Sequence, residues 1–158
     1  MTRRISLFVL MLAGLAIVAC STSSDFVILN RSNNTIEVKY KWKRCTPGAP
    51  SSSHSDNMFP TILTIREFEN SGNKWLNLDQ ESYENDGCTF IVNVRPGQAL
   101  RLFQAYNYSD RDDEYGDFRF GIQDLTIAGR NGIIRLEGKQ TQHLFKKVDT
   151  GNYVIEYQ

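Results

Sequence analysis

Residues 35–43 carry the sequence TIEVKYKWK, and this stretch decides the fold class. Its four apolar side chains alternate with charged ones: Ile36, Val38, Tyr40 and Trp42 fall on every second position. Successive side chains of a strand point to opposite faces, so this period of two predicts a strand with one buried face and one face in water.

Similar segments lie on both sides of it. Residues 26–30 are apolar, and the turn signal at 31–34 predicts a hairpin over residues 26–43. Downstream, we expect strands at 60–68, 88–94, 99–106, 118–128 and 133–136 and a final strand around 153–157, with strand or turn at 142–146. A change of register near Asp124 predicts a β-bulge, and Asn131-Gly132 is the strongest hairpin turn in the chain.

This pattern gives about seven to nine strands without a predicted helix. Strands at such spacing favour an all-β domain, namely one antiparallel β-sandwich of the Ig-like or transthyretin-like kind. A small β-barrel is the alternative.

The N-terminus has a different composition. Arg3 and Arg4 precede a fifteen-residue apolar run at residues 5–19. A membrane-spanning helix needs about 20 apolar residues, so this run is better suited to the apolar region of a secretory signal peptide. The run ends in Ile17-Val18-Ala19-Cys20.

This tetrapeptide resembles the lipobox of bacterial lipoproteins, with an aliphatic residue three before the cysteine and a small residue directly before it. The resemblance implies that residues 1–19 are removed and that Cys20 is lipidated. Ser21 after the cysteine resembles lipoproteins sorted to the outer membrane, on its periplasmic side. Residues 20–25 then form a short tether, and residues 26–158 form the β domain.

Removal of the leader changes the charge balance. The chain has 18 basic and 18 acidic residues, and loss of Arg3 and Arg4 leaves a net charge of −2. The mature chain has no basic excess, so we expect no nucleic-acid partner.

Two further cysteines, Cys45 and Cys88, remain outside the lipobox. An exported chain with two cysteines predicts one disulfide between them, and two free buried thiols are the alternative. Neither residue belongs to a Cys-x-x-Cys pair, so the sequence does not support a redox-active role.

Acidic residues mark a possible cation loop. Asp110, Asp112 and Glu114 alternate in the way that calcium ligands do, but Tyr115 and Gly121 occupy the positions where a calcium loop needs glycine and glutamate. Solvated loop charge is the simpler interpretation, so these three residues are weak metal candidates. A copper or zinc site at His54 and Met58 is weaker still.

The remaining candidate is Trp75, which lies in a polar stretch and is expected to be exposed as a binding aromatic, for example for a sugar. The chain lacks a Gly-x-Ser-x-Gly motif. We therefore expect a non-enzymatic binding or assembly module without a cofactor, attached to the membrane and bound to another envelope protein. A ligand-binding or metal-binding lipoprotein is the alternative, and a hydrolase is a remote one.

Overall fold

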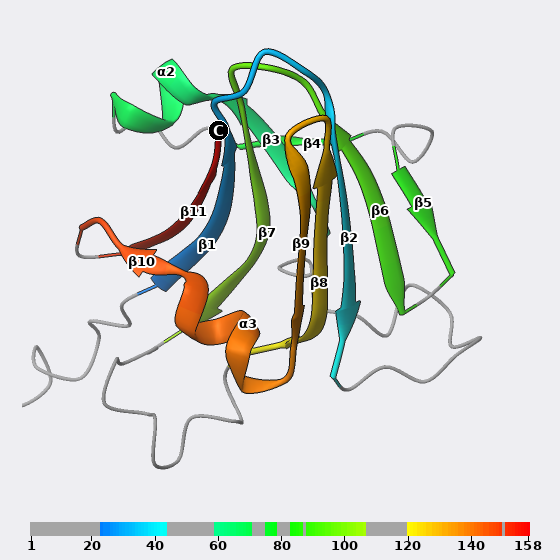
Figure 1. Ribbon diagram of the computed structural model, residues 1–158. Helices are drawn as coiled ribbons and strands as arrows, with labels where there is room; N and C mark the ends of the chain where they lie inside the picture. The colour runs from blue at the N-terminus through cyan, green and yellow to red at the C-terminus, as the bar shows by residue number, and fades with distance from the viewer. Residues whose placement is uncertain are drawn as a thin grey trace, which may run out of the picture.

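The computed structural model describes residues 23–43, 59–70, 75–78, 83–86, 88–106, 120–149 and 151–158. Two β-sheets pack face to face in a β-sandwich (Figure 1). The six-stranded sheet has the order β10-β11-β1-β7-β3-β4, with β10 Lys146–Lys147, β11 Asn152–Tyr157, β1 Ser23–Asn30, β7 Gln98–Tyr106, β3 Thr61–Thr64 and β4 Leu76–Asn77. The five-stranded sheet has the order β5-β6-β2-β8-β9, with β5 Tyr83–Asn85, β6 Thr89–Val94, β2 Ile36–Trp42, β8 Ile122–Gly129 and β9 Gly132–Glu137.

The predicted sandwich is confirmed, and the barrel alternative is wrong because both sheets are open at two edges. The described residues form eleven strands where seven to nine were expected, and β4, β5 and β10 are only two or three residues long. One pair departs from the expected antiparallel arrangement, since β1 and β11 run parallel.

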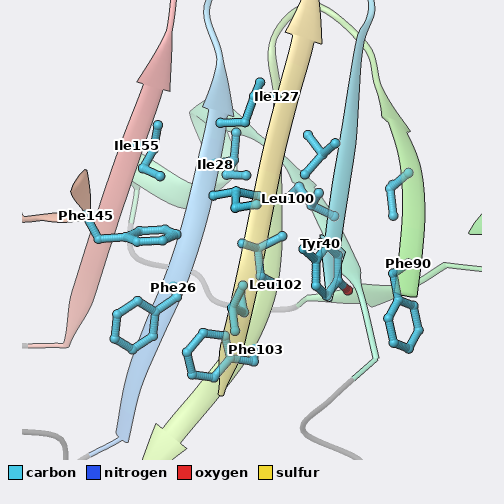
Figure 2. Close-up of a cluster of buried hydrophobic side chains, with 14 of the residues drawn as sticks. Phe26, Ile28, Tyr40, Phe90, Leu100, Leu102, Phe103, Ile127, Phe145 and Ile155 are labelled. Atoms are coloured by element: carbon cyan, nitrogen blue, oxygen red, sulfur yellow. The ribbon is translucent and has the colours of Figure 1, made fainter. Parts of the chain in front are cut away.

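The core lies between the two sheets, as Figure 2 shows. The alternation in β2 behaves as predicted, with every apolar side chain buried and every intervening charged one exposed. Aromatic rings fill the lower part of this core: Phe26 stacks on Phe103 at 4.5 Å and on Tyr153 at 5.0 Å between ring centroids. Each such ring contributes roughly 1.5–3 kcal/mol by leaving water.

The predicted hairpin over residues 26–43 is wrong, because β1 and β2 belong to different sheets. Asn30 explains the crossing. Its buried side-chain amide donates to the backbone oxygen of Val94 at 2.8 Å, and its side-chain oxygen accepts from the backbone and hydroxyl of Ser32. These bonds stabilise an arch from one sheet to the other. In addition, both faces of β1 are buried, which suits an inner strand of a covered sheet.

Two details of the β8–β9 region were predicted correctly. Lys41 pairs with Asp124 and Trp42 with Ile122, so one residue of β8 is extra and forms the bulge. The hairpin also forms, with Gly129 opposite Gly132, so its loop residues are Arg130 and Asn131, one position earlier than the predicted dipeptide.

Two short helices replace predicted strand or turn. The strand expected over 60–68 ends at Thr64, where helix α2 (Ile65–Glu69) begins. Thr64 and Glu67 form a capping box, in which each side chain accepts a hydrogen bond from the backbone N–H of the other. Helix α3 (Lys139–Leu144) occupies most of the expected strand or turn at 142–146.

The first strand begins earlier than expected. β1 starts at Ser23, so it includes three residues that were assigned to the tether, and two of these, Ser24 and Asp25, are buried. Within the described residues, no helix is long and apolar enough to cross a membrane.

Candidate functional site

The structure describes only part of the predicted site. Cys20, Cys45, Asp110, Asp112 and Glu114 lie outside the described residues, so their predicted roles remain predictions. Cys88 is buried and disulfide-bonded, and its partner lies outside the described residues. Trp75 is described, and the candidate site is built around it.

Trp75 lies against the outer face of the six-stranded sheet. A second apolar cluster covers that face and comprises Val27, Leu29, Leu63, Ile65, Phe68, Ala99 and Val154, with Trp75 packed against it. The indole ring is 6.0 Å from the Phe68 ring of α2, measured between centroids. Trp75 is therefore half-buried, and the expectation of an exposed aromatic is corrected: the cluster under α2 removes much of the ring from water.

A polar network lies beside this ring. The carboxylate of Asp25 accepts hydrogen bonds from Trp75 Nε1 at 3.2 Å and from Gln104 Nε2 at 3.0 Å. Arg101 Nη1 lies 3.5 Å from the same carboxylate, and the guanidinium carbon lies 4.9 Å from the centroid of the Trp75 ring. Trp75 thus connects an apolar cluster to a buried charge.

Asp25 is only 6% exposed, and this burial has an electrostatic consequence. Burial raises the pKa of the Asp25 carboxyl above its ordinary range, because the charged form loses its water. Arg101 and the hydrogen bonds from Gln104 and Trp75 favour the charged form and offset part of this effect. Carboxyls with a perturbed pKa cluster at functional sites and also occur in structural ion-pair networks.

A bulge in β7 creates the network. Residues 101 and 104 are three apart, so in a regular strand their side chains would point to opposite faces. Here Phe26 pairs with Phe103 and Val27 with Arg101, which leaves Leu102 as an extra residue. The bulge lets Arg101 and Gln104 both reach Asp25 on the outer face.

Two further residues border the network. Thr61 pairs with Arg101 across β3 and β7 and is 2% exposed; its hydroxyl has no hydrogen-bond partner among the described residues. Tyr106 follows Gln104 by two positions on β7 and is 50% exposed. We call Trp75, Arg101, Gln104 and Tyr106 together the aromatic–arginine face.

Sequence reasoning missed Asp25, Arg101 and Gln104. Asp25 was assigned to the tether. In the predicted strand over 99–106, the alternation placed Gln104 in line with Leu100 and Leu102, and Arg101 stood at an intervening polar position. A usable signal was the pair Leu102-Phe103, where two consecutive large apolar residues interrupt the alternation of β7. Such a pair indicates either a bulge or a strand buried on both faces.

Other polar features are less organised. On the outer face of the five-stranded sheet lies an open hollow of about 330 Å³, lined by Lys39, Glu84, Asn85, Asp86, Thr89 and Ile91. The Asp86 carboxylate there accepts from the backbone N–H groups of Cys88 and Thr89, which lowers its pKa. No group of three or more His, Cys, Asp or Glu residues suited to a metal ion occurs within the part of the chain that the structure describes.

Comparison with protein-family models, curated proteins and solved structures found no match to this chain. A functional proposal therefore depends on the side chains of this chain alone.

Proposed function

We propose that this chain is a membrane-anchored lipoprotein that binds another envelope protein through the aromatic–arginine face, as a non-enzymatic binding or assembly module. The anchor is lipid on Cys20, and the outer membrane, on its periplasmic side, is the proposed location.

The observation that carries the proposal is the arrangement of Trp75, Arg101 and Tyr106 on one face. Tryptophan, tyrosine and arginine are the residue types most enriched among the energetic centres of protein interfaces. Arg101 and Trp75 are oriented in advance, since both contact the buried Asp25 carboxylate. Side chains that are already ordered lose less conformational entropy when a partner binds.

The tether limits where this partner is found. Only three residue steps separate Cys20 from the start of β1 at Ser23, and an extended chain of that length spans at most about 11 Å. Ser23 itself pairs with Tyr106. A lipidated Cys20 therefore places the aromatic–arginine face next to the bilayer, which favours a partner that is itself at the membrane.

The anchor is tested by mass spectrometry of the mature protein from cells. We expect an N-terminal Cys20 that carries acyl chains, and a Cys20→Ala variant that fractionates away from the membrane. A mature chain that begins elsewhere, or an unmodified Cys20, would contradict the proposal.

The binding face is tested by site-specific photocrosslinking in cells. A photoreactive phenylalanine at position 106 is expected to give one discrete crosslinked envelope protein. The matched control is position 133 on the five-stranded sheet, because Ile133 is 59% exposed and Tyr106 is 50% exposed. Equal crosslinking at both positions, or none at position 106, would sink the assignment of this face.

A further inference from the structure

A short exposed segment lies at one edge of the six-stranded sheet and does not belong to the aromatic–arginine face. It runs from the end of α3 through β10 and comprises Leu144, Lys146, Lys147 and Val148. Val148 is 57% exposed and Leu144 36%, although both are large and apolar. We call these four residues the lysine–valine edge.

This edge has a fixed position in the fold. Phe145, between Leu144 and Lys146, is buried, and its ring lies 5.3 Å from that of Phe26 and 5.9 Å from that of Phe120. The ammonium group of Lys147 lies 5.7 Å from the centroid of the Tyr153 ring. The exposed apolar side chains are thus held by a packed core and do not belong to a loose terminus.

The edge also lies beside the start of β1. After Val148 the chain turns back, with the backbone N–H of Val148 donating to the oxygen of Asn152 at 3.0 Å. The backbone N–H of Asp25 donates to the oxygen of Gly151 at 2.7 Å, so this turn packs directly against the first residues of β1. Figure 1 shows β10 and the start of β1 at the same end of the sandwich.

We propose that the lysine–valine edge lies on the surface of a lipid bilayer that contains anionic headgroups. The inference rests on the proposed lipid at Cys20, because a tether of three residue steps brings this end of the sandwich to the membrane. Exposed aliphatic side chains next to lysines fit the boundary between acyl chains and headgroups. Lysines near an anionic leaflet are attracted to it.

Charges around the edge favour this orientation. The acidic residue of the turn is Asp149, and its carboxylate accepts from the backbone N–H groups of Gly151 and Asn152 and from the Asn152 side chain. It is thus engaged in capping the turn. On the neighbouring helix the charged or titratable residues are Lys139 and His143, and Glu137 precedes that helix on β9.

The test uses the full lipidated protein in nanodiscs of phosphatidylcholine with phosphatidylglycerol, compared with the same protein in neutral detergent. Hydrogen exchange of residues 144–149 is expected to be about threefold slower in the nanodiscs, because a bilayer contact suppresses local opening. Lys146→Glu with Lys147→Glu is expected to remove most of this protection. The matched control reverses Arg95, just after β6, and Arg130, in the β8–β9 hairpin; both lie at the other end of the sandwich, and this variant is expected to change nothing.

A second comparison separates apolar contact from charge. Val148→Ser is expected to reduce the protection, whereas Ile133→Ser, at a site of similar exposure on β9, is expected to leave it unchanged. Equal exchange in nanodiscs and detergent, with lipid on Cys20 established by mass spectrometry, would overturn this inference and leave the proposed function standing. An unlipidated Cys20 would overturn both. Protection that appears only when other envelope proteins are present would show a protein contact and would also overturn it.

Discussion

Trp75 Nε1 donates a hydrogen bond of 3.2 Å to the carboxylate of Asp25, fifty positions earlier in the chain. The bond joins the segment next to β4 to the beginning of β1. The indole packs against the apolar cluster under α2, and the Arg101 guanidinium carbon lies 4.9 Å from the centroid of its ring. The same ring therefore takes part in covering the sheet and in presenting the aromatic–arginine face.

Replacing Trp75 with phenylalanine separates these two contributions. The variant keeps an aromatic ring against Phe68 and loses the donor to Asp25, so we expect the free energy of unfolding to fall by about 1 kcal/mol. Urea denaturation followed by far-UV circular dichroism measures this change. Trp75→Ala, which also removes the ring packing, is expected to cost more. A Trp75→Phe variant as stable as the parent would show that the hydrogen bond adds nothing.

The raised pKa of Asp25 predicts a pH dependence of stability. The folded state binds this proton more tightly than the unfolded state, whose carboxyl titrates near 3.8. Stability from this group is therefore fully present below about pH 3.8 and is lost as pH rises through the raised value. Asp25→Asn has no such proton to lose.

We thus expect the free energy of unfolding of the parent, minus that of Asp25→Asn, to be larger at acidic pH than at pH 7. Chemical denaturation of both proteins across this range measures it, and the subtraction cancels carboxyls that behave in the opposite way, such as Asp86. A difference that grows with rising pH would mean that Arg101 and the hydrogen bonds outweigh the burial of the Asp25 carboxylate.

The sequence was sufficient to predict the sandwich for a simple reason. Burial on one face of a strand imposes a period of two, and β2 carries that period over its whole length. The β8 bulge was also accessible, since Ile122 and Leu125 are both apolar and are three apart, which a regular strand cannot place on one face. Local patterns of this kind involve one strand and its own two faces.

Pairing between strands was harder, because it depends on residues distant in sequence. Residues 31–34 alone are compatible with a hairpin turn or with an arch. The hydrogen bond that stabilises the arch joins Asn30 to the backbone oxygen of Val94, 64 positions away, and no local pattern reveals it. The candidate site has the same origin, since Asp25 becomes a buried acid only when β7 supplies Arg101 and Gln104. The capping box of α2 is different: Thr64 and Glu67 had the required spacing, and this signal was overlooked.

Gly121 gives a test of the packing at the lower end of the core. A Cβ at this position would overlap the ring of Trp42, which is 4% exposed. We expect Gly121→Ala to lower the free energy of unfolding by about 2 kcal/mol, because a packed core yields poorly to an added methyl group. In a double-mutant cycle measured by denaturation, Trp42→Leu is expected to relieve part of that loss. Additive effects of the two substitutions would contradict the predicted overlap.

The cation prediction is tested by thermal unfolding. We expect millimolar calcium to leave the Tm unchanged, because the loop of Asp110, Asp112 and Glu114 has Tyr115 and Gly121 where a calcium loop needs glycine and glutamate. The same is expected for copper and zinc. A rise in Tm with calcium that Asp112→Asn abolishes would favour the metal-binding alternative over the assembly module.

The disulfide of Cys88 gives an independent test of the lipoprotein assignment. Cys88 is bonded, and the chain has only two other cysteines, Cys20 and Cys45. If Cys20 carries lipid, the bond must join Cys45 and Cys88, and peptide mapping without reduction is expected to find that pair.

The bond would close a loop of about 43 residues, so Cys45→Ser and Cys88→Ser are each expected to lower the free energy of unfolding by about 4 kcal/mol. The two variants should match, because each removes the same crosslink. Two neighbouring contacts hold Cys88 in place independently of the crosslink: its backbone oxygen accepts from Trp42 N at 3.0 Å, and its N–H donates to the Asp86 carboxylate at 2.9 Å. A crosslink between Cys88 and Cys20 would refute lipidation at Cys20, and the membrane anchor with it.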